Sequence, residues 1–186
     1  GKVLWNGKNI LHMGRKFRRI LGYMPQQQNL YDSFTGRRFL LYLAALKEIP
    51  RKQAAAEIQR TAEMVHLSAE LDKKLAAYSG GMKQRLHAAA TLLGDPKLII
   101  TDEPTAGLDP KERVRLREVL AKLAHDRIIL VATHVVSDVE HVASEILLLK
   151  EGQLVDRDTP GALVEKYAPG GTLEEVYLSI FGEDEA

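Results

Sequence analysis

The stretch Leu98-Ile99-Ile100-Thr101-Asp102-Glu103 decides the fold, because it joins an apolar strand to two adjacent carboxylates. A short run of branched apolar residues between turn signals is typical of a buried strand. Further along, Asp109-Pro110 begins a helical pattern, Ile128–Ala132 is a second apolar run, and Glu145–Leu149 is a third. Strands that alternate with helices predict an α/β fold with a parallel sheet. Since these strands lack polar alternation, we expect the sheet to be covered on both faces.

The two carboxylates at the end of the first strand predict a site. Ligands of open α/β sheets bind beyond the carboxyl ends of the strands. Asp102 would hold the hydration shell of Mg²⁺, which favours carboxylate and water ligands, and Glu103 would orient and polarise an attacking water. The alternative is a pair of strand-end carboxylates solvated at the surface, and the two interpretations are about equally supported by this run alone.

The residues before this core are predicted to be mainly helical. Helices are expected at about 35–46, 52–65 and 79–94, after short strands at Val3–Trp5 and Ile20–Met24. A short helix at Ser137–Val142 and two at about 160–181 complete the pattern. We therefore expect four segments. These are a β-containing segment at 1–26, an all-helical insert at 27–95, an α/β core at 96–157, and C-terminal helices at 158–186 with a frayed acidic tail at 183–185.

The sequence Tyr78-Ser79-Gly80-Gly81-Met82 stands at the start of the third predicted helix. Two glycines there expose backbone N–H groups, and the positive end of the helix dipole adds to them, so that together they bind phosphate. A plain serine cap with flexible glycines is the alternative. A cap needs only one such residue, so the glycine pair favours the functional interpretation modestly.

Three further polar residues follow predicted strands or begin a helix. His134 comes just after the strand 128–132, and Gln26 comes just after the strand 20–24. A side-chain amide in that position can reach a metal or water, although a lone histidine or a polar residue after a strand is usually structural. Asp109 has a clear structural role, because Asp109, Pro110 and Glu112 together predict an N-cap, a first-turn proline and a capping-box-like acid.

Jointly, these motifs resemble the ABC ATPase family in order and spacing across essentially the whole chain. The resemblance implies a P-loop NTPase (RecA-like) core with an all-helical signature subdomain. Gln26 resembles the Q-loop glutamine and 78–82 the signature motif. The pair Asp102 and Glu103 resembles the Walker B acids, 106–109 the D-loop, and His134 the switch histidine.

What the resemblance implies is an ATPase that uses ATP and Mg²⁺ and works as a head-to-tail pair of subunits. Ser79, Gly80 and Gly81 would touch the γ-phosphate held by the partner. Asp102 would serve Mg²⁺ and Glu103 would be the catalytic base. By the same resemblance, His134 would contact the γ-phosphate, Gln26 would link the metal to a membrane partner, and Asp109 would signal across the dimer.

The chain departs from the family at its front end. No Gly-x-x-x-x-Gly-Lys-[Ser/Thr] occurs, so the backbone cradle and the lysine that bind phosphates in this family are absent from the sequence. We expect a chain truncated before or through that loop, with 1–26 a remnant of the N-terminal β subdomain, and expect it to bind and hydrolyse ATP poorly by itself. Tyr78 and Met82 replace the usual Leu and Gln, and Thr101 replaces an apolar residue.

Composition places further bounds on partners and location. The formal net charge is +1, which does not favour nucleic acid, and there is no cysteine. No run approaches the ~20 apolar residues of a membrane helix, so a protein that works at a membrane must dock there on another subunit. The family resemblance implies a cytoplasmic subunit that docks on an integral membrane permease at the inner face of the cell membrane.

The segments 34–46 and 172–178 resemble ABC-2-type exporters of drugs, antibiotics or peptides. By that resemblance, Tyr31 and Phe34 would receive a short helix of the permease, or else simply fill the core of the helical lobe. A non-transport ABC ATPase and a non-catalytic regulatory module remain as alternative functions.

Overall fold

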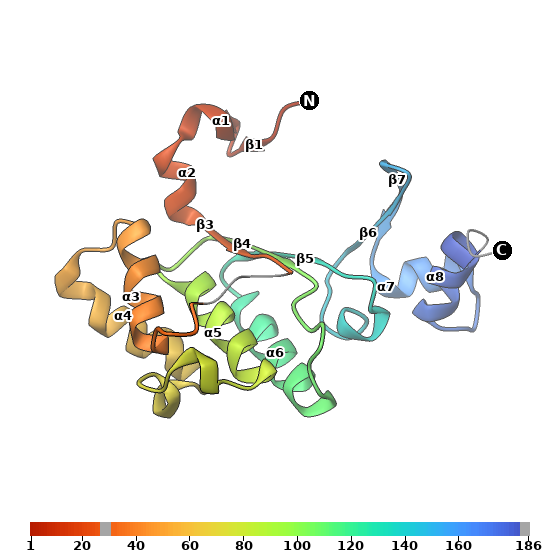
Figure 1. Cartoon of the computed structure of the whole chain (residues 1–186). Helices are drawn as coiled ribbons and strands as arrows, with labels where there is room; N and C mark the ends of the chain where they lie inside the picture. The colour runs from red at the N-terminus through yellow and green to blue at the C-terminus, as the bar shows by residue number, and fades with distance from the viewer. Residues whose placement is uncertain (27–30, 183–186) are drawn as a thin grey trace. The chain divides into compact units, whose positions relative to one another are not determined.

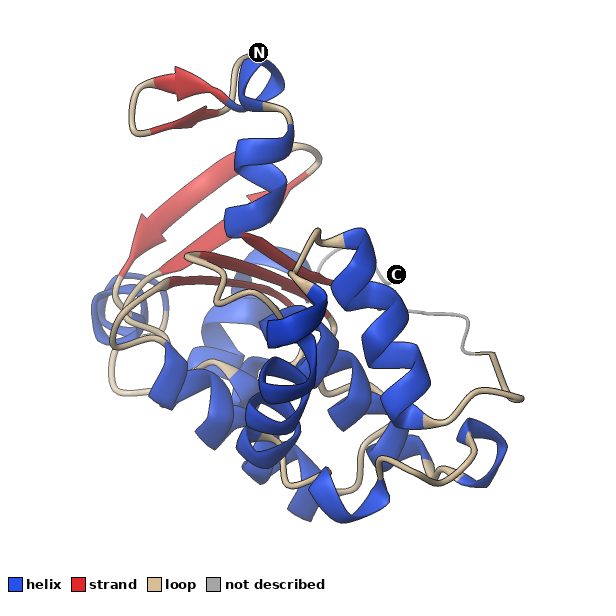
Figure 2. Ribbon diagram, turned by 90° about the vertical axis from the view of Figure 1, so that its left-hand side faces the viewer, coloured by secondary structure: helices blue, strands red, loops and turns tan. Residues whose placement is uncertain are grey.

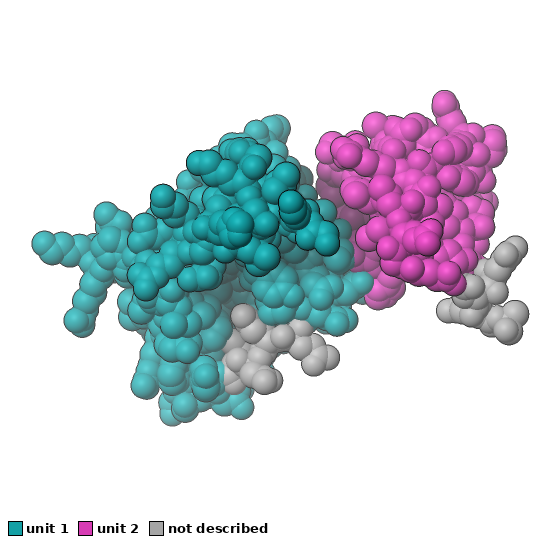
Figure 3. Space-filling model, turned by 90° about the horizontal axis from the view of Figure 1, so that it is seen from above, with its two compact units in different colours: residues 1–132 teal, residues 133–186 magenta. Residues whose placement is uncertain are grey.

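The computed structural model describes residues 1–26 and 31–182 of the 186-residue chain. The chain divides into two compact units, residues 1–132 and residues 133–186, which Figure 3 colours separately. The predicted acidic tail at 183–185 lies outside the described residues, as does the predicted start of the helical insert at 27–30. The division into four segments stays a prediction.

The centre of the first unit is a parallel sheet of three strands, β3 (Leu21–Met24), β4 (Leu98–Asp102) and β5 (Ile128–Ala132), in the order β3-β4-β5. Met24 pairs with Thr101, and Thr101 pairs with Val131. The sheet confirms the α/β fold with parallel strands. Its register also brings the carboxyl ends of all three strands to one edge.

The four longest helices of the first unit lie on the same side of this sheet (Figures 1 and 2). Three of them begin at a side-chain cap, because Thr35, Ser79 and Asp109 each accept a hydrogen bond from a backbone N–H of the first turn. The sequence offered the caps at Ser79 and Asp109. The helices are α3 (Gly36–Leu46), α4 (Arg51–Met64), α5 (Gly80–Leu92) and α6 (Pro110–Leu123). Short 3-10 turns, η1 (Ser68–Glu70) and η2 (Leu75–Ala77), connect α4 to α5.

The opposite face of the sheet remains exposed, which corrects the expectation of cover on both faces. Ile99 and Thr101 point into the core at 1% and 0% exposure, whereas Tyr23, Ile128 and Leu130 are 53%, 58% and 47% exposed. An unbroken apolar run means that both faces of a strand can be buried. Whether both are buried depends on other elements of the protein that pack against each face.

The N-terminal residues form a small hairpin and two short helices. Strands β1 (Leu4–Trp5) and β2 (Lys8–Asn9) pair antiparallel across the Asn6-Gly7 turn, in which both residues have positive φ. Helices α1 (Ile10–Met13) and α2 (Arg15–Ile20) follow, and α2 leads directly into β3. Asn-Gly favours such a tight turn, because both of its residues readily adopt positive φ.

The second unit has its own sheet and its own core. Strand β6 (Ile146–Lys150) pairs antiparallel with β7 (Gln153–Asp158), so the third apolar run does not extend the parallel sheet. The cause is local, because Glu151 and Gly152 both have positive φ and form a two-residue hairpin turn. The helix expected at 137–142 is only a 3-10 turn, η3 (Val136–Asp138).

The end of the chain matches the two expected helices, α7 (Pro160–Tyr167) and α8 (Leu173–Phe181). Leu163, Leu173 and Val176 from these helices pack with Leu148 of β6 into a small apolar core. No helix among residues 1–26 and 31–182 is both long and apolar enough to cross a membrane.

Candidate functional site

The loop after β4 holds Glu103 in an unusual backbone conformation. Its φ is 46°, in the left-handed region that a non-glycine residue rarely adopts, and the residue is only 9% exposed. Its N–H donates to the Ala132 carbonyl at 2.8 Å, and its carbonyl accepts from the Ala106 N–H at 3.2 Å. Such conformations persist where surrounding contacts hold them, and they cluster at functional sites.

Gln26 and the carboxylate pair lie at the same edge of the parallel sheet. Met24 and Thr101 are paired, so Gln26 and Glu103 each stand two residues beyond one registered pair. Gln26 is exposed and Asp102 is half-buried, so both are accessible from solvent. The first unit therefore brings together three of the predicted site residues.

His134 follows Ala132 of β5 by two residues and belongs to the second unit. Its position beside the carboxylate pair stays a prediction.

The start of α5 has the serine cap that the sequence offered as one interpretation of this motif, and anion binding there stays a prediction. The Ser79 hydroxyl accepts a hydrogen bond from the Met82 N–H at 3.2 Å, and the Lys83 N–H donates to the Ser79 carbonyl at 2.9 Å. A Cβ added to Gly80 would meet nothing within 4 Å, so that face of the helix end is open. Met82 is half-buried and packs on the core, which gives this departure from the family a packing role.

Tyr78 anchors the loop that leads into α5. Its hydroxyl donates to the Glu70 carbonyl at 2.7 Å, and its side chain is 6% exposed. The ring lies so close to Gly36 that a Cβ there would collide with the hydroxyl. Burial, with the charges of Glu70 and Asp72, raises the pKa of Tyr78 to about 12.

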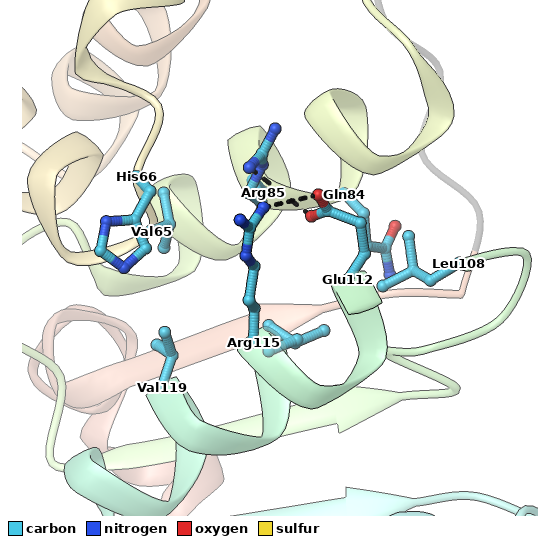
Figure 4. A pocket seen from close by; sticks show the side chains of 9 residues that line it. Val65, His66, Gln84, Arg85, Leu108, Glu112, Arg115 and Val119 are labelled. Atoms are coloured by element: carbon cyan, nitrogen blue, oxygen red, sulfur yellow. Dashed lines mark hydrogen bonds and ion pairs between the residues drawn. The ribbon is translucent and has the colours of Figure 1, made fainter. Parts of the chain in front are cut away.

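Asp109 caps α6, as the sequence predicted, by accepting from the Glu112 N–H at 2.9 Å. The sequence predicted a capping-box-like role for the Glu112 side chain, but its recorded contacts are different. Its carboxylate instead accepts from Arg115 at 3.1 Å and forms an ion pair with Arg85 of α5 at 3.6 Å (Figure 4).

Two residues that the sequence did not single out join α5 to the loop after β4 and to α6. The Gln84 side chain donates to the Pro104 carbonyl, directly after Glu103, and Arg85 pairs with Glu112. Their position three and four residues after Gly81 on a helix was the only available signal, because one turn of helix places such residues near the same neighbours. Both contacts join segments distant in sequence.

Residues 1–106 match the family model described as ABC transporter.

The chain belongs to the ABC transporter family.

Among its ABC relatives are ABC transporter A family member 1 of Dictyostelium discoideum, 33% identical over 96% of this chain, and Nod factor export ATP-binding protein I of Burkholderia orbicola, 32% identical over 100%. The chain spans only 20% and 60% of the lengths of these two relatives. A solved structure described as the ATP binding subunit of an ABC transporter superposes with a TM-score of 0.82 at 25% identity, covering 97% of this chain and 76% of that one. These likenesses confirm the ABC ATPase fold.

The sheet edge carries oxygen donors that could hold a magnesium ion bound together with a nucleotide. Within the described part of the chain, no group of three or more His, Cys, Asp or Glu side chains is placed to hold a metal alone. Magnesium bound with a nucleotide keeps several waters and takes phosphate oxygens, so one or two protein oxygens suffice. Asp102 and Gln26 offer a carboxylate and an amide oxygen at that edge.

The Tyr78 hydrogen bond generates a test of how the loop before α5 is held. Tyr78→Phe should lower the free energy of unfolding at pH 7 by about 1 kcal/mol, because the hydrogen bond to Glu70 is lost. The pKa of Tyr78 is raised from 10.0 to about 12 in the folded protein, so the stability from its neutral hydroxyl is present below pH 10 and lost as the pH rises toward 12.

The difference between wild type and Tyr78→Phe in urea unfolding should accordingly shrink above pH 10. Tyr42→Phe is the matched control, because the Tyr42 residue is 44% exposed. Equal effects of the two substitutions would contradict the anchoring role.

Proposed function

We propose that this chain acts as the ATP-binding, ATP-hydrolysing part of an ABC exporter of the ABC-2 type. The observation that carries the proposal is the buried, left-handed Glu103 directly after Asp102 at the carboxyl edge of a parallel sheet. The relative named for Nod factor export, matched over 100% of this chain, favours export over the non-transport alternatives.

In this proposal the residues divide the work of phosphoryl transfer, which depends on positioning and charge stabilisation. Glu103 accepts a proton from the attacking water, and Asp102 with Gln26 binds Mg²⁺. Ser79, Gly80 and Gly81 bind the γ-phosphate of a nucleotide held by a second ATP-binding subunit. The contact of His134 with the γ-phosphate and the signal from Asp109 across the dimer are further parts of the proposal.

The role of Glu103 is tested by Glu103→Gln in the assembled transporter. General-base catalysis typically contributes ~10²–10⁴-fold, so phosphate release should slow by at least ~100-fold. Nucleotide binding and the thermal unfolding temperature should stay unchanged, because the amide has the shape of the carboxylate. Hydrolysis within about tenfold of wild type would contradict a role as general base.

ATP binding by the 186-residue chain alone is expected to be weak. Its sequence has no Gly-x-x-x-x-Gly-Lys-[Ser/Thr], whose backbone N–H groups and lysine bind the phosphates in P-loop proteins. Calorimetric titration with Mg-ATP should show no micromolar binding, whereas an ABC protein that carries the loop, titrated in parallel, should bind. Micromolar affinity of the chain alone would overturn this expectation.

A groove in the first unit supports docking on a membrane subunit. A cavity of about 320 Å³ opens between α2, β3 and the ends of α3 and α5, with Tyr23, Leu43 and Leu46 as apolar lining. Arg15, Arg18 and Arg19 border it, with Glu48 as the acidic lining residue. The charge favours a short amphipathic helix with acidic residues, contributed by the permease at the inner membrane face.

The aromatic residues named from the sequence lie on neighbouring parts of the same lobe. Tyr31 is 54% exposed and stacks on Phe34 at 5.0 Å, while Phe34 is half-buried and packs on the core. Phe34 thus has the packing role that the sequence left open, and Tyr31 remains available to a partner.

The docking groove is tested by Leu46→Asp. Leu46 is 63% exposed in the groove, so the substitution should leave the fold intact but reduce co-purification with the membrane subunit by at least ~10-fold, since one buried leucine contributes ~1.5–3 kcal/mol. Leu11→Asp is the matched control, because Leu11 is 83% exposed and does not line the groove. Equal binding by both variants would argue against docking here.

A further inference from the structure

The start of α5 and the start of α6 touch through one side chain, Glu112. A Cβ added to Gly81 would lie 3.2 Å from Cγ and 3.3 Å from Cδ of Glu112. The same carboxylate pairs with Arg85 one turn further along α5. Glu112 therefore contacts α5 at two points while its own backbone N–H is bonded to Asp109.

The two glycines of the helix end differ in what surrounds them. Gly80 has open space where a side chain would be, and Gly81 has Glu112. Neither glycine has a positive φ, so backbone conformation does not require glycine at either position. A Cβ at position 81 would be in tight contact with Glu112, which would have to shift by a few tenths of an ångström.

The charges around Glu112 make the contact specific. The side chains of Glu112 and Arg85 are 16% and 19% exposed, and Arg115 adds a second guanidinium on the other carboxylate oxygen (Figure 4). A carboxylate shielded from water in this way depends on its cations, because removing one partner leaves a poorly solvated charge. Val65, Leu108, Leu116 and Val119 line the small cavity beside these groups.

We propose that Glu112 is a positioning residue that holds the first turn of α5 against the loop and helix that carry Asp109. The helix end with Ser79–Gly81 and the capped start of α6 then move as one body. Gln84 extends the connection to Pro104, beside Glu103. The catalytic meaning of this coupling rests on the proposed function, because it would make phosphate contact at α5 depend on the position of Asp109.

Amide hydrogen exchange measured by NMR on the 186-residue chain tests the coupling without nucleotide. Glu112→Ala should speed exchange at the Met82 and Lys83 amides by about fivefold, the effect of losing one partly buried ion pair. Gly81→Ala should do the same by steric conflict. When Glu112→Ala is already present, adding Gly81→Ala should raise the exchange rate by less than about twofold, because the Glu112 side chain that the added methyl group would contact is no longer there.

Two controls separate this contact from a general loss of stability. Gly80→Ala should leave Met82 and Lys83 exchange within about twofold of wild type, since nothing lies near Gly80. Gly81→Ala combined with Glu112→Gln should still exchange faster than Glu112→Gln alone, because glutamine keeps the volume of glutamate. Amides of α3 and α4 should be unaffected in every variant.

Two results would overturn the proposal. One is an exchange rate in the double variant that is raised by the product of the two single-variant factors, which would mean that Gly81 and Glu112 act independently. The other is faster exchange in α6 with no change at Met82 and Lys83. In the assembled transporter, Glu112→Ala should lower kcat at least threefold while the KM for ATP changes less than about twofold. An unchanged kcat would contradict the claim that this contact matters for catalysis. If only the Glu103→Gln and Mg-ATP titration experiments fail, the proposed function is wrong, but the contact between α5 and α6 measured by amide exchange still holds.

Discussion

The structure of the first unit depends on the hydrogen-bonded register of three parallel strands. Met24 pairs with Thr101, and Thr101 pairs with Val131, so the three strands end at the same edge of the sheet. Parallel strands direct all their carboxyl ends to one edge, where α/β proteins bind their ligands. Gln26 and the Asp102-Glu103 pair come together there although 75 residues of sequence lie between Gln26 and Asp102. A slip of one residue would move each side chain to the opposite face of the sheet.

At that edge the protein keeps Glu103 in a backbone conformation that costs on the order of 1–3 kcal/mol. Two backbone hydrogen bonds hold it, to Ala132 of the neighbouring strand and from Ala106 in the following turn. Both bonds involve main-chain atoms, so the conformation survives a change of side chain. The contact of Gln84 with the Pro104 carbonyl ties this turn to α5 as well. The strained backbone at Glu103 and the first turns of α5 are thus linked within a few residues.

Two residues next to the start of α5 differ from those usual in the family, and the structure shows how each one packs. Tyr78 replaces the leucine usual in the family, and its hydroxyl is accommodated by a glycine at position 36 and a backbone carbonyl at Glu70. Met82 replaces glutamine and packs on the core. Gly81 accommodates Glu112. The departures at Tyr78 and Met82 thus each have neighbours that fit them.

The sequence by itself determined the elements whose signals are local. The caps at Ser79 and Asp109, the Asn6-Gly7 turn and the apolar strands were predictable, because their hydrogen bonds join residues within a few positions. The motif order also predicted the family. Only the tertiary structure decided that one face of the sheet stays exposed and that Glu112 pairs with Arg85. Those outcomes depend on which distant segments meet, and a single sequence carries no measure of the competing contacts.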